Sequence, residues 1–98
     1  MKKLYISHPN IERTMEEDAE FKQKIVERVS SYLDEMLILL PESPYFPSEL
    51  SGMSRLVQML TIMTEADVVY FSHGWETNRE CAIQHMCALQ YGLITIEA

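Results

Sequence analysis

The chain alternates between short runs of apolar residues and longer segments in which apolar residues recur every three or four positions. Short, nearly continuous apolar runs are typical of strands buried on both faces, whereas the longer spacing is typical of amphipathic helices. The predicted strands are residues 4–7, 37–40, 67–72 and 93–96. The predicted helices run from about residue 10 or 14 to 35, from 53 to 65 and from 77 to 91.

This order of elements, β-α-β-α-β-α-β, predicts a parallel sheet covered by helices on both faces. Right-handed crossovers then give a small flavodoxin-like or Rossmann-like α/β sandwich with the strand order 2-1-3-4. Thr14 and Glu17 have the spacing of a capping box for the first helix, and Gly92 is expected to end the last one. In this order the first and third strands are neighbours, which brings residues 7–9 next to residues 72–75.

The length of 98 residues corresponds to one domain spanning residues 1–98. A content of 47% hydrophobic residues is enough for one core, and so small a domain is a plausible homo-oligomer. The net charge of −7 disfavours nucleic acid as a partner, since proteins that bind nucleic acids need a basic face.

Cys81 and Cys87 point to different faces of one helix and cannot bridge each other. Without a signal peptide or a membrane-spanning stretch, we expect a cytoplasmic protein.

The segment from Ser72 to Glu80 is the best candidate for a binding site, because it follows a buried strand and opens a helix. Backbone N–H groups at such a helix start point towards ligands bound beyond the strand ends. Gly74 permits a tight turn there. Thr77 and Glu80 have capping-box spacing, with the Thr77 hydroxyl expected to cap the Glu80 N–H. Asn78 and the first-turn amides are candidates for holding a phosphate.

Two histidines, His8 and His73, are expected at the strand ends facing one crevice. They either act together in proton transfer or only line the crevice and form hydrogen bonds there. No third ligand at metal spacing accompanies them, so neither a metal nor a cofactor is expected. A third histidine, His85, is better explained as a packed and hydrogen-bonded side chain. Trp75 either stacks on a base or covers the core, as do Tyr45 and Phe46.

The connection at residues 42–52 is either an ordered loop over the crevice or a plain link between elements. No dinucleotide-binding, phosphate-loop, serine-hydrolase or zinc-protease motif is present. The remaining catalytic option is a carboxylate, and Glu80 lies one helical turn before Gln84.

Two segments resemble the nucleoside 2-deoxyribosyltransferase-like superfamily. The sequence Tyr-Ile-Ser-His-Pro at residues 5–9 is similar to its N-terminal Tyr-Ile-Ser-Gly-Pro pattern. The strand at residues 66–71, followed by Gly-Trp-Glu at 74–76, resembles its small, phage-associated branch. The resemblance implies an oligomeric α/β protein that binds nucleosides or nucleoside 5′-monophosphates and cleaves N-glycosidic bonds with a glutamate nucleophile.

On this resemblance, Tyr5 matches the tyrosine that orients the nucleophile. Ser72, Gly74 and Asn78 lie where the ligand-cradling turn is expected, and Ser7, in the segment that resembles the N-terminal pattern, is a further ligand-binding candidate. The nucleophile position falls on Gln84, and the position of an aspartate that helps to protonate the base falls near Met59. A glutamine amide cannot form the glycosyl ester that a carboxylate forms.

Three hypotheses follow from this pattern. The first is a nucleotide- or nucleoside-binding protein with a degenerate N-glycosidase site, which could sequester a nucleotide-derived signal. The second is a working N-glycosidase or deoxyribosyltransferase in which Glu80 is the nucleophile. The third is a structural or interaction module whose crevice is filled by Tyr45, Phe46 and Trp75.

Overall fold

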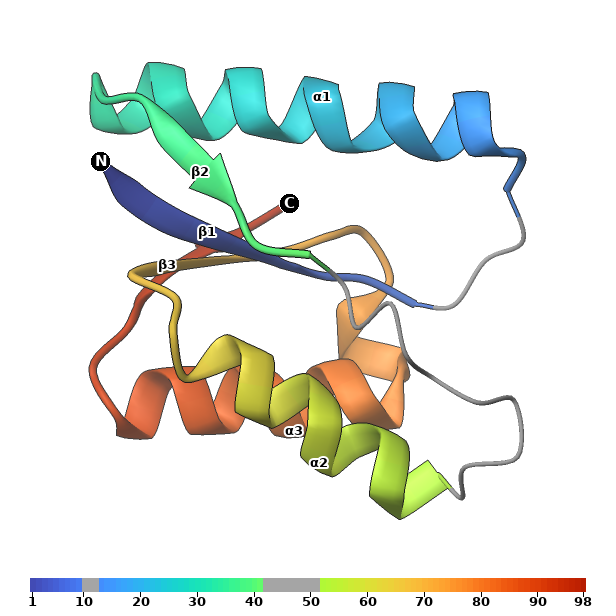
Figure 1. Cartoon of the computed structure of the whole chain (residues 1–98). Helices are drawn as coiled ribbons and strands as arrows, with labels where there is room; N and C mark the ends of the chain where they lie inside the picture. The colour runs from blue at the N-terminus through green and yellow to red at the C-terminus, as the bar shows by residue number, and fades with distance from the viewer. Residues whose placement is uncertain (10–12, 42–51) are drawn as a thin grey trace.

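Four parallel strands form one sheet in the order β2-β1-β3-β4, with helices on both faces (Figure 1). The computed structural model describes residues 1–9, 13–41 and 52–98. The elements are β1 (Lys2–Ser7), α1 (Met15–Leu33), β2 (Leu37–Leu39), α2 (Gly52–Met63), β3 (Val68–Phe71), the 3-10 turn η1 (Trp75–Thr77), α3 (Arg79–Gln90) and β4 (Ile94–Glu97). The α/β fold and the strand order predicted from the sequence are confirmed.

The central strand, β1, pairs with β2 on one side and with β3 on the other. Leu4 is opposite Leu39 of β2 and Val68 of β3, and Ser7 is opposite Phe71. Because all the strands run in the same direction, β1 and β3 reach their carboxyl ends at the same edge of the sheet. That edge carries the predicted site.

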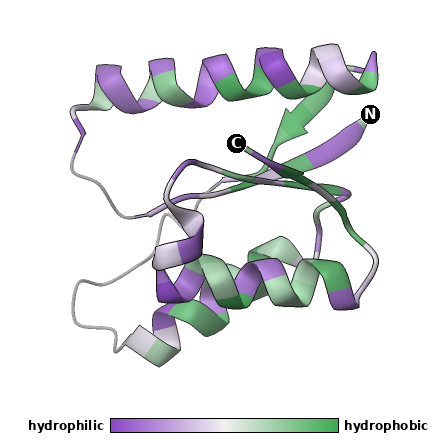
Figure 2. Ribbon diagram, turned by 180° about the vertical axis from the view of Figure 1, so that it is seen from behind, coloured by the Kyte–Doolittle hydropathy of each residue, from purple (hydrophilic) through white to green (hydrophobic). Residues whose placement is uncertain are grey.

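The helices form two unequal layers, with α1 on one face of the sheet and α2 and α3 on the other (Figure 1). Side chains alternate along β1, so that Leu4 and Ile6 pack with Val29 of α1, while Tyr5 packs with Phe71 in the core beneath α2 and α3. In Figure 2 polar and apolar residues alternate along α1, as expected for a helix with one face on the sheet and one in solvent. The sheet therefore separates two cores.

Most predicted helix ends agree with the structure. Thr14 caps α1 in a capping box: its hydroxyl accepts from Glu17 N, and its own N–H donates to the Glu17 carboxylate, both at 3.1 Å. Gly92, with φ of 73°, ends α3, and the next N–H, of Leu93, donates to the carbonyl of Ala88 at 3.0 Å. The predicted loop at residues 42–52, with Tyr45 and Phe46, lies outside the described residues except for Gly52, where α2 begins.

Candidate functional site

The ends of β1 and β3 lie side by side. Ser72 N–H donates to the carbonyl of Ser7 at 2.9 Å, and a Cβ placed on Gly74 would lie 3.6 Å from the ring of Pro9. The structure therefore brings residues 7–9 and 72–75 together, as expected from the strand order. Gly74 has φ of 90°, a left-handed conformation that side chains disfavour. This residue turns the chain from β3 into η1.

The predicted cap of α3 is wrong. Thr77 closes η1, and its hydroxyl donates to the Gly74 carbonyl at 3.2 Å instead of accepting from the Glu80 N–H. The N-cap is Asn78, which has the extended backbone that a cap needs and whose Oδ1 accepts from Cys81 N at 3.0 Å. The short η1 turn shifts the start of α3 by two residues relative to the predicted helix. Glu80 takes no part in a capping box, and its carboxylate is 3.6 Å from the Arg79 guanidinium.

Gln84, which belongs to α3, is a buried polar side chain of the candidate site. Only 1% of it is exposed, and its Oε1 accepts a hydrogen bond of 2.5 Å from the Ser7 hydroxyl. Its Nε2 donates to the Met59 sulfur at 3.3 Å. The amide thus joins β1, α2 and α3 through uncharged side-chain contacts, and we call these three residues the Ser7–Gln84–Met59 cluster.

A thiol lies beside this cluster. Burial raises the pKa of Cys81, and this effect exceeds the lowering by a hydrogen bond with Ser7; the negative charge of Glu80 raises the pKa further. Cys81 is therefore a neutral packed thiol at physiological pH. Both Cys81 and Cys87 are unbridged.

The two histidines at the strand ends have different surroundings. His8 is half-buried and its ring meets that of Phe21 of α1 edge-on, with centroids 5.4 Å apart. Its Nδ1 is 2.9 Å from the carbonyl of Pro9. His73 is exposed. His8 therefore turns to the α1 side of the sheet, whereas Ser7 and Gln84 meet on the other side.

Trp75 packs on α3. Its ring stacks on His85, with centroids 4.0 Å apart and planes at 19°, and Phe71 meets the same histidine edge-on. His85 Nε2 is 2.7 Å from the Glu97 carboxylate, so this histidine is packed and paired as expected. One face of Trp75 is occupied by His85. Tyr5, which the resemblance matches to the tyrosine that orients the nucleophile, is 3% exposed within the α2–α3 core.

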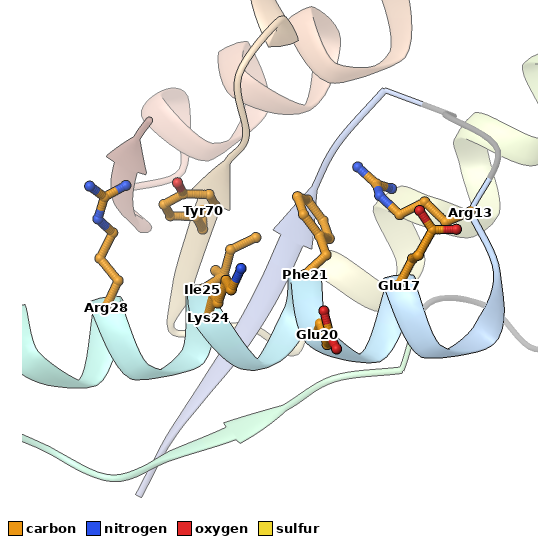
Figure 3. Close-up of a pocket in the computed structure, with 8 residues that line it drawn as sticks. All are labelled: Arg13, Glu17, Glu20, Phe21, Lys24, Ile25, Arg28 and Tyr70. Atoms are coloured by element: carbon orange, nitrogen blue, oxygen red, sulfur yellow. The ribbon is translucent and has the colours of Figure 1, made fainter.

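Sequence reasoning missed a groove on the α1 face. This hollow, of about 540 Å³, lies between α1 and β3 (Figure 3). Its lining combines basic and aromatic side chains, including Arg13, Phe21, Lys24, Arg28 and Tyr70. The signal available in the sequence was the recurrence of Phe21, Lys24 and Arg28 at helical spacing, on a predicted helix to which no site was assigned. We refer to this hollow as the α1–β3 groove.

Within the described ranges, no group of three or more histidine, cysteine or acidic side chains is arranged to hold a metal ion. None of the helices in those ranges has the length and apolar character needed to cross a bilayer. The sequence matches no model of a known protein family, and it matches no curated protein either.

Proposed function

We propose that the chain binds a nucleoside or nucleotide at the carboxyl ends of β1 and β3 and leaves its glycosidic bond intact. The observation that carries this proposal is the Ser7–Gln84–Met59 cluster. A neutral, buried amide occupies the position where the resemblance to deoxyribosyltransferase-like enzymes requires a carboxylate nucleophile.

The geometry of the cluster favours this alignment of functional positions. Gln84 and Met59 were matched separately to a nucleophile and to an acid that protonates the base, and they are 25 residues apart. Their side chains are nevertheless in contact at 3.3 Å, as two groups acting on one glycosidic bond would have to be close. Ser7, from the segment that resembles the N-terminal pattern, contacts the same amide.

The chemistry of these side chains supports binding without cleavage. An amide is uncharged and does not form the covalent glycosyl intermediate of a retaining glycosidase. A thioether such as that of Met59 has no proton to give to a leaving base. A protein of this kind holds its ligand, and sequestration of a nucleotide-derived signal is the role that we propose for it.

The edge of the sheet offers several groups to such a ligand. His73 is exposed there, and the left-handed turn at Gly74 brings backbone to the surface. At the start of α3 the amides of Arg79 and Glu80 have no hydrogen-bond partner among the described residues. These amides can donate hydrogen bonds to a phosphate oxygen, although the Asn78 side chain is already engaged as the cap.

The alternative enzyme, with Glu80 as nucleophile, has less structural support. Glu80 is 3.6 Å from the guanidinium of Arg79, so its carboxylate is paired with a positive charge at the start of α3. The alternative of an interaction module is favoured by the burial of Ser7, Ser72 and Gln84, which a ligand reaches only if the edge opens. Ligand binding separates this alternative from our proposal.

The test is calorimetry of the whole chain with nucleoside 5′-monophosphates, ADP-ribose and cyclic nucleotides, followed by analysis of the recovered ligand. We expect saturable binding of at least one of them and its recovery intact. His73→Ala is expected to weaken binding, whereas Gln90→Ala, an exposed change at the other end of α3, leaves it unchanged. Absence of binding to every ligand refutes the proposal, and release of free base establishes the enzyme alternative instead.

A further inference from the structure

We propose that the α1–β3 groove is a binding site for a small organic anion, in which a compact anionic group is attached to an apolar body. The groove lies on the α1 face of the sheet, whereas the Ser7–Gln84–Met59 cluster lies on the opposite face. The two sites are separate, and neither proposal depends on the other. A volume of about 540 Å³ is in the range of small-molecule sites.

Positive charge is concentrated at this groove although the chain carries a net charge of −7. Arg13, Lys24 and Arg28 all border it. Neither Lys24 nor Arg28 forms an ion pair within the described part of the chain. Like charges one turn apart destabilise a helix, and a bound anion would relieve that repulsion.

Two carboxylates also border the groove, and one of them is already engaged. Glu17 accepts a hydrogen bond from the Thr14 N–H in the capping box, and hydrogen bonds with Thr14 lower its pKa. Glu20, one turn before Lys24, forms no ion pair with it. The end of the groove at Lys24 and Arg28 is therefore its cationic end.

Tyr70 adds a hydrogen-bonding group to the cationic end of the groove. Only 4% of this residue is exposed, and its hydroxyl has no hydrogen-bond partner among the described residues. The hydroxyl is not among the fully buried polar atoms, so it is accessible and can form a hydrogen bond with a ligand. Tyr70 lines the groove, and in Figure 3 its hydroxyl and the guanidinium of Arg28 point the same way. A phosphate or carboxylate at this end would accept from both groups.

The rest of the groove suits an apolar body. Ile25 and Phe21 lie between the cationic end and the start of α1. The guanidinium of Arg13 is 3.9 Å from the centre of the Phe21 ring, which closes the far end with a cation–π contact. An aromatic or aliphatic phosphate ester, or the corresponding carboxylate, matches this order of charged and apolar surfaces.

The test is an NMR titration of the isotope-labelled chain with phenyl phosphate, with benzoate as a second arm and phenol as the uncharged control. We expect saturable shifts of amides in α1 and β3 with an anion and none with phenol. The phosphate and carboxylate arms decide which anionic group the site prefers. Tyr70→Phe and Arg28→Gln are each expected to weaken binding about tenfold, because each removes a hydrogen bond to a charged group.

The matched control is Lys22→Gln, which removes the same charge from α1 at an ion pair with Asp18 outside the groove. It is expected to change the affinity by less than about twofold, since this charge does not line the groove and is paired with Asp18. Arg28 is exposed, so its replacement leaves the fold intact and keeps the test valid if Tyr70→Phe alters packing. Absence of saturation, or equal affinity in the groove variants and Lys22→Gln, overturns the proposal. Shifts confined to Ser7, Ser72 and α3 also overturn it and would instead support the nucleotide site.

Discussion

Replacing Gln84 by glutamate introduces the carboxyl group that a glycosidase would need. The position is almost completely buried from solvent. Gln84 is 1% exposed, and no cation is among its hydrogen-bond partners. Desolvation raises the pKa of buried carboxyl groups by as much as about 3–5 units. The hydrogen bond from the Ser7 hydroxyl offsets part of this effect, so we expect a rise of about 3 units above the ordinary value of about 4.3.

The pH dependence of stability follows from this shift. Between the pKa of the unfolded chain and the raised pKa of the native one, the native state binds more protons, so the free energy of unfolding falls as pH rises. A shift of about 3 units corresponds to a loss of about 4 kcal/mol above the native pKa, a large part of the stability of a small domain. Below about pH 4 this loss disappears, because the carboxyl group is protonated in both states.

The assay is urea unfolding of Gln84→Glu and of the unchanged chain, followed by circular dichroism across this pH range. The matched control is Gln90→Glu, the same change on an exposed position of α3. We expect the free energy of unfolding of the control to fall by no more than about 1 kcal/mol, because a negative charge is unfavourable at the C-terminal end of a helix. Equal pH dependence of the two variants would show that position 84 is hydrated, and the reasoning about the cluster would be wrong.

Three further changes test the local contacts by the same unfolding measurement. Ser7→Ala should lower the free energy of unfolding by about 1–3 kcal/mol, because it leaves the side-chain carbonyl oxygen of Gln84 buried and unpaired. Adding Gln84→Met to this variant should recover most of the lost stability. A double variant whose loss equals the sum of the two single losses would contradict this. Asn78→Ala should lower the free energy of unfolding by about 1 kcal/mol, because it removes the cap of α3, and Thr77→Ala should lower it less. The reverse order would show that Thr77 is the cap, as predicted from the sequence. Gly74→Ala should lose about 1–2 kcal/mol from its left-handed backbone, and an unchanged midpoint would contradict the turn geometry.

Hydrophobic spacing was enough to predict the sheet order, because nearly continuous apolar strands separated by helices leave few arrangements once crossovers are right-handed. The start of α3 could not be predicted in the same way. Thr77 and Asn78 are adjacent and both are good capping residues, and only the backbone of η1 decides between them.

Contacts between distant parts of the chain were also beyond sequence reasoning. The hydrogen bond of Ser7 with Gln84 joins residues 77 positions apart, and its existence depends on how α3 rotates over the sheet. The side to which His8 turns is equally a matter of packing, since its partner Phe21 belongs to α1. The α1–β3 groove was missed because Tyr70 contributes to it from β3, an element far from α1 in the sequence.

The stacking of Trp75 on His85 has a practical consequence. Trp75 is the single tryptophan of the chain, so its fluorescence originates from one place, the turn that leads from β3 to α3. Any event that separates the indole from the imidazole, such as unfolding of this turn, changes the surroundings of the only strong emitter. The protein therefore contains an intrinsic optical reporter, and its response can be followed without attaching a dye.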